Sequence, residues 1–84
     1  MKISIITACI NSEGTIKRTI ESILSQEYID IEYIIIDGES SDSTISIINN
    51  FKKRISKVVS ESDNGIYDAL NKGVHLATGD IIGF

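Results

Sequence analysis

A regular alternation of short apolar runs with amphipathic segments is the feature that most restricts how this chain can fold. Apolar runs at residues 3–8 and 33–36 are each followed by a polar turn and then by a segment of helical periodicity. Two further candidate strands follow at residues 58–59 and 80–84. Strands that alternate with helices in this way are typical of βαβ units, so the sequence predicts an α/β fold with a parallel sheet.

Three helices are predicted between these strands, at residues 15–26, 43–52 and 67–77. The first has four apolar side chains at i, i+4, i+7 and i+8, which lie on one face of a helix: Ile16, Ile20, Ile23 and Leu24. The third has a stripe made of Tyr67, Leu70, Val74 and Ala77, and Gly79 follows as a stop signal. We expect both faces to pack on the sheet.

Size and charge exclude several classes of protein. A chain of 84 residues supports one small domain, and 42% apolar with 24% charged residues is a globular mixture. A net charge of −4 provides no basic surface for nucleic acid. A single cysteine, Cys9, permits no internal disulfide and is interpreted as a packing residue, which favours the cytoplasm. No signal peptide and no apolar stretch near the ~20 residues of a membrane span are present.

The candidate ligand-binding residues follow the strands, because ligands of open parallel sheets bind beyond the carboxyl ends of the strands. Three segments are in this position: residues 7–11, 37–40 and 61–65. Neither a G-x-G-x-x-G fingerprint nor a P-loop pattern is present, so dinucleotide and P-loop sites lose their main support. Asp37 ends a buried strand, where a carboxylate without a partner is unfavourable, and it can accept hydrogen bonds from a base or a ribose.

Four sequence elements in a fixed order resemble family 2 glycosyltransferases. They are residues 3–11 (ISIITACIN), 21–26 (ESILSQ), 32–44 (EYIIIDGESSDST) and 62–73 (SDNGIYDALNKG), and the last is followed by 77–84 (ATGDIIGF). The resemblance spans residues 3–84 and implies a Rossmann-like βαβαβαβ half of a GT-A fold. It also implies that residues 1–84 are the N-terminal nucleotide-binding part, cut off before the D-x-D-like metal motif.

The resemblance carries expectations about activity. The intact protein should transfer a sugar, with inversion, from a nucleoside diphosphate sugar, most simply a UDP-sugar, to a glycan or a lipid-linked acceptor. Mg²⁺ or Mn²⁺ is expected as cofactor, with its ligands and the catalytic base beyond residue 84. Within this segment we therefore expect neither catalytic nor metal-binding residues, and no transferase activity. The intact protein is expected in the cytoplasm, where it can work at the inner face of the membrane.

The resemblance also assigns nucleotide-binding residues. Asp37 is expected to bind the base, and Ala8 and Ile10 to pack near it, where the family often has Pro or Thr and an aromatic residue. The other expected contacts are Asn11, Asp63, Asn71 and Lys72.

Two positions depart from the family pattern. Gly38 replaces a second Asp that is common there, and Leu70 replaces a frequent Arg that approaches the phosphates. Lys72 or Lys17 is available to compensate.

Several of these residues also have purely structural interpretations. Residues 40–42 are typical helix caps, and we favour that role for them. Residues 63–65 form a turn signal that competes evenly with a nucleotide contact. Asp68 and Lys72, at i and i+4, can brace an exposed helix face, and His75 is expected at the surface.

Two classes of function remain for the chain, a sugar-transferring enzyme and a non-catalytic nucleotide-binding or assembly module. A flavodoxin-like regulator is a further alternative that rests on fold analogy alone. The strand at residues 80–84 has no helix after it to cover its apolar side chains. An unpaired strand edge invites another chain to pair with it, so we expect the 84-residue segment to self-associate.

Overall fold

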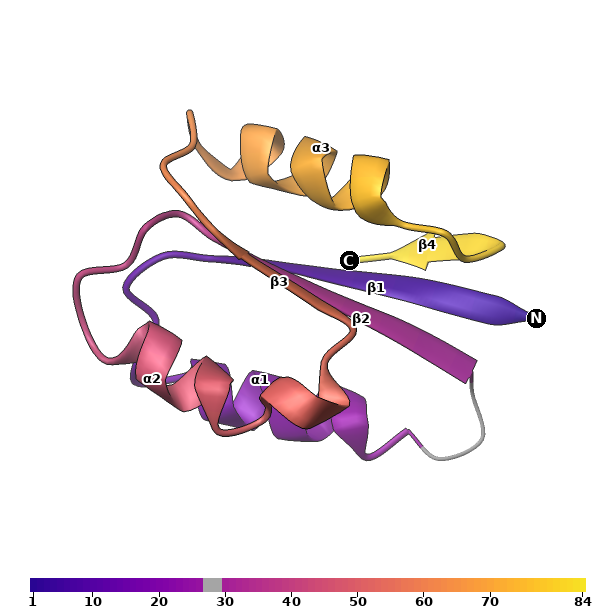
Figure 1. Cartoon of the computed structure of the whole chain (residues 1–84), viewed down its shortest axis with the longest axis horizontal. Coiled ribbons are helices and arrows are strands. Elements are labelled where there is room, and N and C mark those ends of the chain that lie inside the picture. The colour runs from indigo at the N-terminus through magenta and orange to yellow at the C-terminus, as the bar shows by residue number, and fades with distance from the viewer. Residues whose placement is uncertain (27–29) are drawn as a thin grey trace.

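The computed structural model describes residues 1–26 and 30–84, which form a parallel sheet with helices on both faces (Figure 1). Within these residues the sheet has four strands in the order β3-β2-β1-β4. The strands are β1 (Lys2–Cys9), β2 (Asp30–Asp37), β3 (Lys57–Ser60) and β4 (Ile81–Gly83). All pairings are parallel. The predicted α/β class and the predicted parallel sheet are confirmed.

Helices connect the strands and divide between the two faces of the sheet. Helices α1 (Ile16–Leu24) and α2 (Thr44–Asn49) lie on one face, and α3 (Ile66–Leu76) lies on the other (Figure 1). The second predicted helix is shorter than expected: α2 ends at Asn49, and a separate 3-10 turn, η1 (Lys52–Arg54), leads into β3. Among the described residues, no helix combines the length and hydrophobicity that crossing a membrane requires.

Strand β2 is at the centre of two apolar cores because its side chains alternate between the faces of the sheet. Tyr33 and Ile35 pack in the core with α1 and α2, which also contains Ile16, Ile20, Ile48 and Ile55. Ile34 and Ile36 pack in the core under α3, together with Ile6 and Ala69. Both faces are covered, which explains why β2 reads as a continuous apolar run and not as an alternating one.

The face of α3 that packs on the sheet coincides only partly with the predicted stripe, of which Leu70 and Ala77 pack against the core under α3. Tyr67 and Val74 of the predicted stripe are 82% and 39% exposed, whereas Ala69 and Gly73 are buried. A Cβ on Gly73 would collide with the side chain of Ile6. The helix therefore approaches β1 closely through its smallest residues, a choice that apolar periodicity does not encode.

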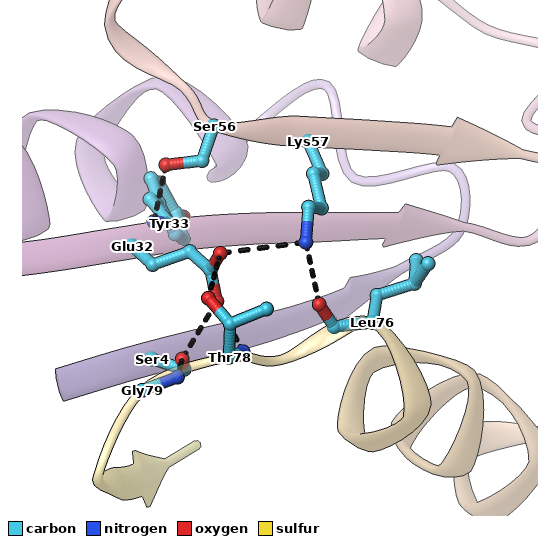
Figure 2. Close-up of polar contacts among 8 residues, drawn as sticks. All are labelled: Ser4, Glu32, Tyr33, Ser56, Lys57, Leu76, Thr78 and Gly79. Carbon is cyan, nitrogen blue, oxygen red and sulfur yellow. Dashed lines mark hydrogen bonds and ion pairs between the residues drawn. The ribbon is translucent and has the colours of Figure 1, made fainter. Parts of the chain in front are cut away.

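A buried polar cluster fixes β4 at the amino-terminal end of the sheet (Figure 2). The carboxylate of Glu32, whose residue is 7% exposed, accepts hydrogen bonds from Ser4 Oγ at 2.7 Å, from Thr78 N–H at 2.8 Å and from Thr78 Oγ1 at 2.9 Å. Lys57 Nζ lies 3.4 Å from the same carboxylate, and Gly79 N–H donates to Ser4 Oγ at 2.8 Å. The segment between α3 and β4 is thus tied to both central strands.

Candidate functional site

Strand register places three polar side chains in one row at the carboxyl ends of the strands. Asp37 pairs with Cys9 of β1 on one side and with Ser60 of β3 on the other. Its carboxylate accepts hydrogen bonds from Ser60 Oγ at 2.9 Å, Ser40 N–H at 2.9 Å, Ser40 Oγ at 2.5 Å and Cys9 Sγ at 3.5 Å. Burial alone raises the pKa of Asp37, but the hydrogen bonds from Ser40 and Ser60 outweigh it and lower the pKa. Asp37 is therefore a carboxylate satisfied by its own chain.

The Asp37 side chain is enclosed by its own chain. It is fully buried, and it has the same parity along β2 as Tyr33 and Ile35, which face α1 and α2. In this arrangement the Asp37 carboxylate is engaged by its own chain, and its predicted contact with a base stays a prediction. The carboxylate instead holds Ser40 and Ser60 together, and so fixes the loop that follows β2.

Cys9 is half-buried beside Asp37 and packs against the core under α1 and α2. Burial, together with the negative charge of Asp37, raises the pKa of the Cys9 thiol to about 12. A thiol held protonated is a poor nucleophile. The interpretation of Cys9 as a packing residue is confirmed.

The loops after β1 and β2 hold each other through reciprocal hydrogen bonds. Asn11 Oδ1 accepts from Ser41 N–H at 2.8 Å, and Ser40 Oγ accepts from Asn11 N–H at 2.8 Å. Asp42, which precedes the N-cap residue Ser43, accepts from Thr44 N–H at 2.9 Å and so satisfies the first N–H group of α2, while Ser43 itself makes no side-chain cap. Ser40 has no capping role, because its hydroxyl is engaged with Asp37 and Asn11. The predicted contact residue Asn11 thus serves as a clamp between loops.

A pocket of about 450 Å³ opens beside the carboxyl end of β1, on the face of the sheet that carries α3. Its size is in the usual range for small-molecule sites. The walls come from the end of β1, the loop after it, the β3–α3 loop and the first turns of α3, through the residues Ala8, Cys9, Ile10, Ser12, Asp63, Gly65, Ile66 and Ala69. Three predicted nucleotide contacts, Ala8, Ile10 and Asp63, are thus brought together.

The pocket is mainly apolar, with a carboxylate on one side. Ile10 and Ile66 are 58% and 62% exposed, which is high for isoleucine and leaves apolar surface free for a planar ligand. Asp63 Oδ1 accepts a hydrogen bond from Gly65 N–H at 3.0 Å, and Gly65 has a positive φ of 109° that favours glycine. The sequence signal at residues 63–65 is therefore a turn that also presents Asp63 to the pocket.

The two remaining predicted contacts lie outside the pocket. Asn71 is exposed on α3. Lys72 Nζ donates to Ser62 O at 3.0 Å and pairs with Glu61 at 3.2 Å and with Asp68 at 3.7 Å. The predicted brace between Asp68 and Lys72 is therefore present, and Lys72 is turned toward the β3–α3 loop instead of the pocket. His75 is exposed, as predicted.

Sequence reasoning missed Ser12 and the wall that α3 supplies to the pocket. Ile66 and Ala69 follow the turn signal at residues 63–65 and line the pocket from the first turns of α3. Their approach to β1 depends on how closely α3 packs on the sheet, which is a tertiary property. The usable signal is an apolar residue, Ile66, directly after a glycine turn and on the same helical face as the buried Ala69 and Gly73.

The described residues do not supply a metal site by themselves. No group of three or more His, Cys, Asp or Glu side chains in residues 1–26 and 30–84 is arranged to hold a metal ion. Asp63, the pocket carboxylate, has Gly65 N–H as a neighbour and no second carboxylate beside it among the pocket residues.

Comparison with solved structures gives the class of the fold, that of the GT-A glycosyltransferases. A mannosyltransferase from Pyrobaculum calidifontis, solved with GDP-Man and Mn²⁺, matches with a TM-score of 0.85 at 25% identity, over 95% of this chain and 25% of that one. Glucosyl-3-phosphoglycerate synthase from Mycobacterium tuberculosis, solved with Mn²⁺, UDP-Glc and glycerol 3-phosphate, matches with a TM-score of 0.76 at 26% identity, over 96% and 31% of the two chains.

Sequence comparison identifies the family. The poly-beta-1,6-N-acetyl-D-glucosamine synthase of Staphylococcus epidermidis is 42% identical over 78 residues, which cover 90% of this chain and 19% of that protein. The family described as Glycosyl transferase family 2 matches residues 4–84, and the chain belongs to this family. It spans about a third or less of the length of its curated relatives, 32% and 19% in two of them. Family membership favours the enzyme interpretation over a flavodoxin-like regulator.

Proposed function

We propose that residues 1–84 form the donor-nucleotide side of a glycosyltransferase, which transfers a sugar from a nucleoside diphosphate sugar to an acceptor. The observation that carries this proposal is the pocket between β1 and α3, which combines apolar walls with the Asp63 carboxylate in a chain of family 2. A base needs apolar surface for its faces and a hydrogen-bond acceptor for its N–H groups. Ile10, Ile66 and Asp63 provide both.

The remaining site residues act indirectly in this proposal. Asp37 and Asn11 set the shape of the pocket, because they hold the loops after β1 and β2 in place. The first turn of α3 lies at the pocket and its N-cap, Gly65, provides no side-chain cap. The N–H groups of that turn carry partial positive charge, and in this proposal they face the diphosphate.

Partners and cofactor are proposed from the neighbouring structures. UDP-Glc and GDP-Man are bound in two of them, each together with Mn²⁺, which supports a nucleotide sugar donor and a divalent cation for this protein as well. A UDP-sugar, a glycan or lipid-linked acceptor and inversion of the anomeric carbon remain predictions from the family. Residues that bind the metal and perform the chemistry are proposed to lie outside residues 1–84, and the cytoplasmic location also stays a prediction.

The first test is a titration of the 84-residue chain with UDP and, separately, with GDP, followed by ¹H–¹⁵N NMR. We expect millimolar affinity, because only one side of the site is present, and chemical-shift changes at Ala8, Ile10 and Asp63. The amides of Glu32 and Thr78, at the opposite end of the sheet, serve as internal controls and should not move. If neither nucleotide shifts the pocket amides, or if both ends shift equally, the proposed site is wrong.

Self-association of the 84-residue chain is a second proposal, which rests on β4. This strand lies at the edge of the sheet, and Ile81 and Phe84 are 45% and 73% exposed. Burying a few hundred Å² of apolar surface contributes several kcal/mol at about 25 cal/mol per Å², before the entropy of association is subtracted. Light scattering over a concentration series should show a dimer or a larger species. A persistent 9.2 kDa species with a cooperative melt would contradict this.

A further inference from the structure

The pocket-facing position at the end of β2 carries no side chain. Asp37 points toward α1 and α2, so the next residue along the strand, Gly38, has the opposite parity and faces the pocket side. The backbone continues the sheet here, since Gly38 N–H donates to Cys9 O at 2.8 Å. A side chain at position 38 would therefore enter the space between the loops that line the pocket.

Asp63 occupies the space that a side chain at position 38 would fill. A Cβ on Gly38 would lie 3.0 Å from Asp63 Oδ2 and 3.4 Å from Ile10 Cδ1. Both contacted residues line the pocket, and both come from other elements than β2. The Asp63 carboxylate can therefore lie next to the end of β2 only because position 38 has no side chain.

Only one carboxylate oxygen of Asp63 is needed for the local turn. Oδ1 accepts the hydrogen bond from Gly65 N–H at 3.0 Å, which fixes the orientation of the carboxylate. Oδ2 is directed toward Gly38 and the pocket. An acceptor that is held on one side and available on the other is suited to a fixed N–H or O–H donor of a ligand.

We propose that Gly38 and Asp63 together determine how this chain recognises its nucleotide: Gly38 leaves the space, and Asp63 Oδ2 accepts a hydrogen bond from a base N–H or a ribose hydroxyl. This inference rests on the proposed function, because it assigns the contact within the same pocket. The carboxylate that binds the nucleotide in this proposal comes from the β3–α3 loop and not from the end of β2.

The experiment measures UDP affinity of the 84-residue chain and its variants by ¹H–¹⁵N NMR. Asp63→Asn keeps the size of the side chain and its bond to Gly65, and it should weaken UDP binding about tenfold, as expected for a lost charge-assisted hydrogen bond. Glu61→Gln removes the same charge two residues away and should leave the affinity within twofold of wild type, because exposed charges at that distance contribute little. A dispersed spectrum confirms that each variant is folded.

Two further variants test the role of Gly38. Gly38→Ala should displace Asp63 and weaken binding although it removes no polar group. The exchange variant Gly38→Asp with Asp63→Ser returns a carboxylate to the same space from β2, and it should bind UDP more tightly than Asp63→Ser alone. Equal affinities of the exchange variant and Asp63→Ser would contradict the proposed sharing of space.

Two analogues identify the ligand group. N3-methyl-UDP lacks the base N–H, and 2′-deoxy-UDP lacks a ribose hydroxyl. Wild type and Asp63→Asn should bind with equal affinity the analogue that lacks the group bound by Asp63. If wild type binds UDP and Asp63→Asn binds it equally well, the inference is overturned while the proposed pocket stands. If wild type does not bind UDP or GDP at all, the proposed function fails first.

Discussion

Replacing Glu32 by Ala should reduce the free energy of unfolding by about 3 kcal/mol, because it leaves several buried groups without a partner. Ser4 Oγ, Thr78 N–H and Thr78 Oγ1 all donate to this carboxylate, and Lys57 pairs with it at 3.4 Å (Figure 2). A small domain has only a few kcal/mol of net stability, so this loss is a large part of the total. Urea unfolding, monitored by circular dichroism, measures it.

The same carboxylate should make stability depend on pH in the acid range. The hydrogen bond from Thr78 N–H, more than any other contact, lowers the pKa of Glu32 from 4.5 to about 2. A lowered pKa in the folded state stabilises the fold above the ordinary pKa, and that contribution is lost as the pH falls from about 4.5 toward 2. Asp37 and Asp42, whose pKa values are also lowered, add to the acid sensitivity of the wild type.

Comparison of wild type with Glu32→Gln isolates the contribution of Glu32. The variant keeps the shape of the side chain but cannot titrate, so the free energy of unfolding should fall less steeply between pH 5 and pH 2 than in wild type. Glu61→Ala is the matched control, since Glu61 makes only an exposed ion pair with Lys72 and its loss should change stability by less than about 0.5 kcal/mol. Equal losses in the free energy of unfolding for Glu32→Ala and Glu61→Ala would show that the buried cluster adds no more stability than an exposed ion pair.

Replacing Gly79 by Ala should displace β4 and destabilise the fold by about 2–3 kcal/mol, because the added Cβ has no space. It would lie 2.6 Å from Ser4 Oγ, 2.7 Å from Ser4 N and 3.0 Å from Lys2 O. Two of these atoms belong to the backbone of β1, so a rotamer change cannot relieve the contact. The hydrogen bond from Gly79 N–H to Ser4 Oγ and the pairing of β1 with β4 should weaken together.

Gly83→Ala is the control for this prediction, because a Cβ on Gly83, at the end of β4, meets no atom within 4 Å. It should leave the free energy of unfolding nearly unchanged. Amide hydrogen exchange separates the two variants further: Gly79→Ala should lose protection at the pairing of Ile3 with Ile81, whereas Gly83→Ala should keep it. An equal effect of the two substitutions would show that close approach at Gly79 is unimportant.

Part of the site could be predicted because it follows local rules. Residues that end apolar strands gather at one edge of a parallel sheet, and Ala8, Ile10 and Asp63 do line one pocket there. The alternation of side chains along β2 also fixes the face to which Asp37 points. The sequence does not show which face that is, because both faces of β2 are covered and its apolar run does not alternate. Lys72 could not be placed, since a long, partly buried side chain takes its partners from whichever loop lies nearest, here Ser62 and Glu61.

Sequence by itself determined the order of strands and helices, the parallel sheet and the family, because these depend on periodicity, turn residues and motifs that are local in the chain. Tertiary structure alone decided which face of α3 packs on β1, through Gly73, and how Glu32 is satisfied by Thr78, 46 residues away. It also decided that Asp63 stands over Gly38. Each of these depends on how closely two backbones approach, and that distance is set by packing of distant segments, which no local pattern records.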